Sequence, residues 1–111
     1  MIETILRDYL KATMDVDVYL DVPSEPGRRY ITLERTGGSR KNHINSTIFA
    51  IQSCSGKSLA EAAALNESVK EAMDRMPETE DIYGAHLNSD YNFTDTQTKV
   101  YRYQAVYEIT Y

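Results

Sequence analysis

The last fourteen residues, TKVYRYQAVYEITY (98–111), alternate between two sets of side chains, and this alternation limits what the chain can fold into. Successive side chains of a β-strand point to opposite faces, so alternate positions form two rows. The row expected to face the core consists of Tyr101, Tyr103, Tyr107 and Ile109, with Ala105 leaving room for a helix. The row left to meet water or another subunit contains Arg102, Gln104, Glu108 and Thr110. The pattern predicts a strand that pairs within a sheet and holds the C-terminus there.

Two other segments, 2–13 and 58–76, repeat their apolar residues at steps of three and four, which predicts amphipathic helices. The first apolar stripe is formed by Ile2, Ile5, Leu6, Tyr9 and Leu10. The second is formed by Leu65, Val69, Ala72, Met73 and Met76. Ser58 and Glu61 have the spacing of a capping box, in which each side chain accepts a bond from the other's backbone N–H. Pro77 is expected to end the second helix.

Four further segments have the alternation or the β-branched content of strands. They are 15–22, 30–35, 46–54 and 82–93. The first should bury Val16, Val18, Leu20 and Val22. The third is apolar on both sides and is predicted to be central. In the fourth, Gly84 suggests a bulge or a close backbone approach. The stretch TGGSRKNHIN (36–45) has no periodicity and is predicted to be a flexible loop.

These segments give the order α-β-β-β-α-β-β, which indicates an α+β fold. We expect a mostly antiparallel sheet with two helices packed on one face. At 111 residues the chain has the length of a single domain, 1–111. The second face of the sheet then requires polar side chains or a partner.

The composition argues against several classes of protein. A formal net charge of −5 does not provide the overall basic surface typical of nucleic-acid binding. No segment approaches the ~18 apolar residues of a membrane span, and the first residues lack a signal-peptide pattern. The single cysteine, Cys54, fits a reducing compartment. We therefore expect a protein made in a cytoplasm, with no membrane partner and no specific nucleic-acid partner.

Motifs for chemistry are incomplete. SCSGKS (53–58) supplies only the Gly-Lys-Ser end of a phosphate-binding loop, because Ile51 stands where the motif requires its first glycine. His43 and His86 have no spacing typical of a zinc site, and Cys54 belongs to no Cys-His-Asn pattern. We predict no catalytic, cofactor-binding or metal-binding residues, and we expect the chain not to be an enzyme.

Charge is segregated along the chain. Five of the twelve basic residues fall in one stretch of fourteen, in which Glu34 is the only acid. They are Arg28, Arg29, Arg35, Arg40 and Lys41. Acids concentrate in 15–25 and 61–81. Segregated charge can steer a complementary surface, so we predict that the five basic residues dock an acidic neighbour, including an identical subunit. The alternative interpretation is a solvated rim of a hairpin.

Three stretches together resemble small tail proteins of prophages and siphophages of Gram-positive bacteria. They are VYLDVPSEPGRRYITLERTGG, NHINSTIFAIQSCSGKSLAEAAALNESVKEAM and LNSDYNFTDTQTKVYRYQAVYEITY. These stretches are similar to the tail terminator (tail completion) family. The resemblance covers nearly the whole chain, and its specificity lies in the ordered set of segments and the length rather than in an active-site motif.

The resemblance implies an α+β fold and a structural role without chemistry. Members of the family form a ring, usually a hexamer, at the head-proximal end of the tail tube. The ring stops tube polymerisation and presents the surface onto which the head connector docks. The implied partners are other copies of the chain, the tail tube protein and the head–tail connector protein. The implied location is the virion tail, assembled in the cytoplasm of the bacterial host.

Alternative functions remain open on the residues alone. One is a head-completion or stopper protein, or another ring of the connector, which would differ in its partner. A more distant one is a cytoplasmic module that binds a small ligand or nucleic acid. For the leading interpretation, we hypothesise that the basic stretch 35–41 docks on an adjacent subunit, the tube or the connector.

Overall fold

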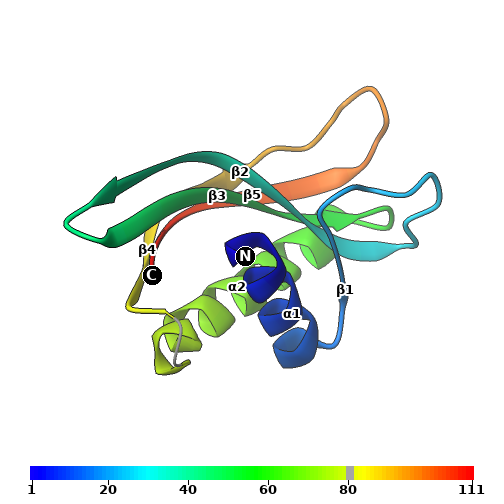
Figure 1. The fold of residues 1–111 in the computed structure, drawn as a ribbon. Helices are drawn as coiled ribbons and strands as arrows, with labels where there is room; N and C mark the ends of the chain where they lie inside the picture. Colours follow the sequence, from blue (N-terminus) through cyan, green and yellow to red (C-terminus); the bar gives the residue numbers. More distant parts are fainter. Residues whose placement is uncertain (80–81) are drawn as a thin grey trace.

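The computed structural model describes residues 1–79 and 82–111, and it confirms the predicted α+β class and element order. The elements are α1 (Ile2–Met14), β1 (Asp17–Tyr19), β2 (Arg29–Lys41), β3 (Ile44–Ser55), α2 (Leu59–Arg75), the short 3₁₀ helix η1 (Met76–Glu78), β4 (Gly84–Asn92) and β5 (Tyr101–Thr110). The strands form one sheet in the order β1-β2-β3-β5-β4. Both helices lie on the same face of this sheet (Figure 1). We call the other face the open face.

The two helices pack through the apolar stripes that the sequence predicts. α1 buries Ile2, Leu6 and Leu10, and α2 buries a row that includes Val69 and Met73. The Tyr9 hydroxyl of α1 donates a hydrogen bond to the Ala72 carbonyl oxygen of α2 at 2.6 Å, which joins the helices directly. α2 ends at Arg75, two residues before Pro77, as expected.

The closing strand β5 lies inside the sheet, between β3 and β4. Ala105, Tyr107 and Ile109 are buried in the core, as predicted. Tyr101 and Tyr103 are only half-buried and lie outside this core, so that part of the prediction is wrong. They lie at the end of the sheet where α2 begins, beyond most of the helix. The C-terminus is held because Tyr111 exchanges two backbone hydrogen bonds with Asn45, at 2.9 and 3.0 Å.

The predicted flexible loop 36–45 is wrong, because most of these residues belong to strands. β2 continues to Lys41 and β3 begins at Ile44, which leaves a two-residue turn. Thr36 is an extra residue in β2, and after this bulge Gly37 and Gly38 pair with β3. At Gly38 a Cβ atom would lie 3.0 Å from the Ser46 carbonyl oxygen and 3.1 Å from Nη2 of Arg35, so little space remains for a side chain. Gly38 therefore makes room within a strand rather than a loop.

β1 is shorter than the predicted strand 15–22 and spans three residues. The helix α1 runs to Met14, and its C-cap Asp15 adopts a left-handed conformation with φ of 51°, which delays the start of the strand. β1 pairs with β2 in parallel, whereas the other strand pairs are antiparallel. Val16 and Val18 are buried as predicted, but Val22 is 51% exposed because the chain has left the sheet there.

β4 contains a bulge, but not at Gly84. The pairing of β4 with β5 shifts between Leu87 and Ser89, so Asn88 is the extra residue. A Cβ atom on Gly84 would meet no heavy atom within 4 Å, which also excludes a close backbone approach there. β4 therefore is an edge strand with a central irregularity, which is a common property of sheet edges.

The turn of the β2–β3 hairpin predicts a stabilising substitution. Asn42 and His43 have φ values of 53° and 65°, and positive φ at both central positions is typical of a type I′ turn. Asparagine tolerates this region, whereas histidine is strained in it. We expect His43→Gly to raise the free energy of unfolding by about 0.5–1 kcal/mol. Urea unfolding measures the change, and His43→Ala, which keeps the strain, should give no gain. A loss of stability in His43→Gly would contradict the turn assignment.

Candidate functional site

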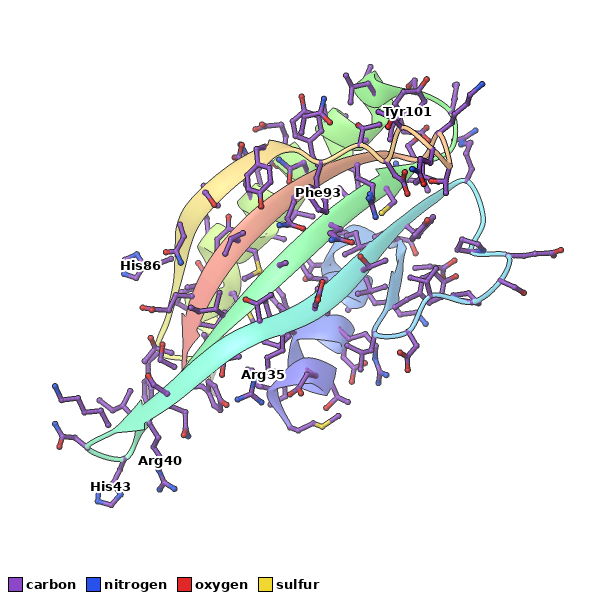
Figure 2. The ribbon with its side chains drawn as sticks, turned by 90° about the horizontal axis from the view of Figure 1, so that it is seen from above. Arg35, Arg40, His43, His86, Phe93 and Tyr101 are labelled. Carbon is purple, nitrogen blue, oxygen red and sulfur yellow. The ribbon has the colours of Figure 1, made fainter. Side chains whose placement is uncertain are left out.

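The five basic residues predicted to dock a partner do not form one cluster. They are distributed along and just before the 13-residue strand β2 of a molecule that measures 44 × 24 × 24 Å. Arg28 and Arg29 lie at its first end, Arg35 lies near its middle, and Arg40 and Lys41 lie beside the hairpin turn. Figure 2 shows Arg35 near the middle of this strand and Arg40 near the hairpin turn. Their docking role stays a prediction, but the structure divides it among three places.

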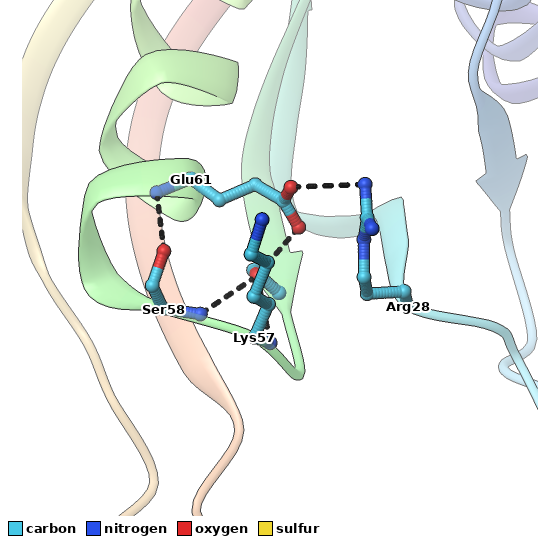
Figure 3. Close-up of polar contacts among 5 residues, drawn as sticks. Arg28, Lys57, Ser58 and Glu61 are labelled. Atoms are coloured by element: carbon cyan, nitrogen blue, oxygen red, sulfur yellow. Dashed lines mark hydrogen bonds and ion pairs between the residues drawn. The ribbon is translucent and has the colours of Figure 1, made fainter.

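Arg28 is held by a contact within the chain. Its Nη2 lies 3.2 Å from Oε2 of Glu61, whose side chain is 16% exposed (Figure 3). The other carboxylate oxygen, Oε1, accepts a hydrogen bond from the Ser55 hydroxyl at 2.8 Å. Glu61 therefore joins the start of α2 to the end of β3 and to the residue before β2. Arg28 is correspondingly less available to a partner than the other four.

The half-motif SCSGKS lies between β3 and α2, where a phosphate-binding loop would lie. Ser55 Oγ accepts hydrogen bonds from the backbone N–H groups of Lys57 and Ser58, at 3.0 and 3.3 Å. Donors that would face a phosphate in such a loop therefore face a serine hydroxyl, and the Glu61 carboxylate lies against the same hydroxyl (Figure 3). The negative charge of the carboxylate disfavours binding of a phosphate at this loop, which agrees with the incomplete motif.

The same contacts correct the predicted capping box. Ser58 Oγ accepts a hydrogen bond from the Glu61 N–H at 3.1 Å, so one half of the motif is present. The Glu61 side chain does not return to Ser58, because it binds Ser55 and Arg28 instead. Ser55 takes over the second half by accepting the Ser58 N–H.

Arg35 and the pair near the turn differ in their surroundings. Arg35 Nη1 lies 3.7 Å from Oε2 of Glu3, a long contact at the N-terminal end of α1. Arg40 and Lys41 are exposed, and neither forms an ion pair with any residue of 1–79 or 82–111. An exposed cation without an internal partner keeps its charge for another surface. Arg29, at the other end of β2, is likewise exposed and without an ion pair in residues 1–79 and 82–111. Arg40 and Lys41 are adjacent, so they offer two such charges at one place.

A hydrogen-bonded row of side chains crosses the open face and was not predicted from the sequence. Thr32 Oγ1 donates to Gln52 Oε1 at 2.8 Å, and Gln52 Nε2 donates to Gln104 Oε1 at 2.8 Å. Gln104 Nε2 in turn donates to the Tyr91 hydroxyl at 2.6 Å. The row joins β2, β3, β5 and β4 at one level of the sheet. These bonds give hydrogen-bond partners to the side-chain amides of Gln52 and Gln104 on the face that the two helices do not cover.

Aromatic side chains extend this row at the β4 edge. The rings of Tyr91 and Phe93 meet edge to face, with centroids 6.1 Å apart. The Arg102 guanidinium lies over the Phe93 ring at 5.0 Å, and its Nε donates to the Phe93 carbonyl oxygen. Phe93 remains 43% exposed. In the sequence, the two-residue spacing of Tyr91 and Phe93 indicates that both rings lie on one face of a strand. Their position beside Arg102 depends on the register between β4 and β5, which the sequence does not show.

The other residues considered for chemistry lie apart. His43 is at the hairpin turn, and His86 is on the edge strand β4 (Figure 2). Within residues 1–79 and 82–111, no group of three or more His, Cys, Asp or Glu side chains is placed to hold a metal ion. In the same residues, no helix is long and apolar enough to cross a membrane.

Comparison of the sequence with models of protein families finds no match, and neither does comparison with curated proteins.

The polar row predicts a measurable coupling between two glutamines. Gln52→Ala and Gln104→Ala each remove the same hydrogen bond, so the double variant should lose less stability than the sum of the single variants. We expect a coupling free energy of about 0.5–1.5 kcal/mol from urea unfolding of the four proteins. Gln52→Ala combined with Glu108→Ala is the matched control, because Glu108 lies on the same face without a bond to Gln52. Additivity in the first pair would contradict the bond.

The thiol of Cys54 is predicted to react slowly in the folded protein. The residue is buried, and burial raises the pKa of its thiol to about 11, against a smaller opposing effect of the Arg102 charge. A raised pKa favours the neutral thiol, so roughly one molecule in a thousand carries the thiolate at pH 8. Labelling with a thiol reagent should be slow at pH 8 and faster as pH rises, and it should become fast at pH 8 in denaturant. Fast labelling of the folded chain at pH 8 would exclude this environment.

Proposed function

We propose that the chain is a structural phage tail protein, a tail terminator that forms a ring on the end of the tail tube. The ring would stop polymerisation of the tube and provide the surface for joining to the head. The proposal rests on the ordered resemblance of nearly the whole chain to that family. The observation that supports it best is the hairpin, whose turn extends beyond the helices (Figure 1). Beside the turn lie two exposed cations, Arg40 and Lys41, which form no ion pair with residues 1–79 or 82–111.

The proposed mechanism is geometric and requires no reaction. Identical subunits joined head to tail close into a ring when the rotation between neighbours divides a full turn. One face of the ring would match the exposed end of the tube, and the other would not accept a further tube subunit. The proposed partners are other copies of the chain, the tail tube protein and the head–tail connector protein.

Electron microscopy of the purified protein tests the proposal. At high protein concentration, negatively stained images should show rings of uniform diameter. Added to polymerising tube protein from the same phage, the chain should bind tube ends and shorten the mean tube length. An unrelated globular protein of the same net charge, which does not bind the tube, is the control for non-specific effects on polymerisation.

Cross-linking distinguishes the proposed position from neighbouring positions in the connector. A tail terminator should cross-link to the tube protein at the head-proximal end of the tail. Cross-links to portal-side proteins without tube contacts would contradict the proposal. Failure to form rings and failure to cap tubes, seen together, would also overturn it.

A further inference from the structure

Two edges of the sheet are free over matching lengths. β1 pairs with residues 30–32 of β2, so in the described chain β2 has no strand partner on that side from Leu33 to Lys41. At the opposite edge, β4 pairs with β5 alone from Gly84 to Asn92. Each edge exposes a row of backbone N–H and C=O groups, which can pair with a further strand.

The pairings across the sheet place the two free edges at the same level. Leu33 pairs through β3 and β5 to the level of Asp90, and Ser39 pairs through the same strands to the level of Gly84. β2, β3, β5 and β4 alternate in direction. β4 of a second copy placed beside β2 would therefore be antiparallel to it and would continue the sheet. Such a contact joins different surfaces of identical subunits, which is the kind that closes rings.

The two edges also carry opposite charge on the side of the helices. Beside β4, the Lys70 amino group lies 2.8 Å from the carboxylates of both Glu67 and Asp90. Asp74 adds a third carboxylate on the same helix. All three carboxylates act on the buried Tyr107, where burial and these charges, led by Asp74, raise the phenol pKa.

The β2 edge is basic on the helix side. Register places Arg35 and Arg40 on that side, and Glu34 and Lys41 on the open face. Arg35 lies at the level of Leu87, near the carboxylates, whereas Arg40 lies beyond the level of Gly84. A net negative edge and a net positive edge on one molecule attract in a head-to-tail arrangement and repel in a head-to-head arrangement.

We infer that the free edge of β2 in one copy of this chain pairs with β4 of the next copy and continues the antiparallel sheet between subunits. The inference rests on the ring of the proposed function and specifies the interface within it. Backbone pairing between the two edges supplies the contact, and the opposite charges select its direction. It places Arg35, near the middle of β2, closest to the carboxylates beside β4 of the next copy.

A proline in β4 tests the backbone pairing. Tyr111, directly after β5, exchanges two backbone hydrogen bonds with Asn45 of β3, so alternation directs the backbone groups of Glu108 toward β4. His86 pairs with Glu108, and the N–H of the next residue, Leu87, therefore points away from β5 at the free edge. Proline is tolerated at an edge position whose N–H faces outward. We expect Leu87→Pro to weaken self-association at least about tenfold, because the pyrrolidine ring removes the donor and obstructs the neighbouring strand.

Leu87→Ala is the matched control, because it shortens the same side chain, which is 44% exposed, and keeps the N–H. It should associate like the unaltered chain in sedimentation velocity. Circular dichroism and urea unfolding verify that both variants are folded, and hydrogen exchange of the Glu108 amide, which faces β4, reports whether the β4–β5 pairing is intact. Equal association of the proline and alanine variants, both folded, would overturn the inference.

A charge exchange tests the direction of the contact. Arg35→Glu with Arg40→Glu makes the helix side of the β2 edge acidic, and Glu67→Lys with Asp74→Lys makes the β4 edge basic. Each double variant places like charges across the proposed interface and should associate at least about tenfold more weakly. An equimolar mixture of the two variants, and the single chain with all four changes, restores opposite charges and should recover association.

The outcomes separate this interface from the proposed function. Rings that form equally well in all variants would refute the edge pairing and leave the tail terminator proposal standing. Self-association of the unaltered chain into open filaments rather than rings, if Leu87→Pro abolishes it, would support the edge pairing and contradict the ring. No self-association of the unaltered chain at any concentration would refute both.

Discussion

The pairing of β3 with β5 beneath the two helices is the interaction on which the rest of the structure depends. At its centre Phe49 lies opposite Tyr107, and both side chains are almost completely buried. β4 has no partner in the described chain other than β5, so the sheet is complete only when β5 is in place. The Tyr-rich end of the chain is therefore an interior strand of the sheet, and the Tyr107 ring belongs to the core, whereas Tyr101 and Tyr103 lie outside it.

The open face follows from the same arrangement. Because both helices cover one face, the row of β5 that contains Gln104 has no covering layer (Figure 1). The polar side chains on this face form hydrogen bonds with one another across four strands, from Thr32 to Tyr91. A shift of one residue in any pairing would move these groups to the core face, where their polar atoms would be buried without partners. The row therefore favours one register of the sheet.

The fold was predictable because period and polarity agree over long segments, as in α1, α2 and β5. The arrangement at the hairpin was not, because Gly37 and Gly38 have the composition of a loop, and the close approach of the Ser46 carbonyl oxygen and the Arg35 side chain to Gly38 appears only in the structure. The basic stretch was visible in the sequence, but its division along β2 depends on the length of the strand. The polar row on the open face could not be found either, since it requires the register of four strands at once.

The bulges in the two free edges bear on how selective their pairing can be. Thr36 in β2 and Asn88 in β4 are the extra residues, and both lie next to the level of Tyr107. A bulge increases local twist and discourages pairing with a flat strand, which protects an exposed edge from indiscriminate association. A partner whose edge is twisted at the same level avoids this penalty. The edge of β4 meets that requirement toward the edge of β2, so features that exclude unrelated strands also favour a second copy of the same chain.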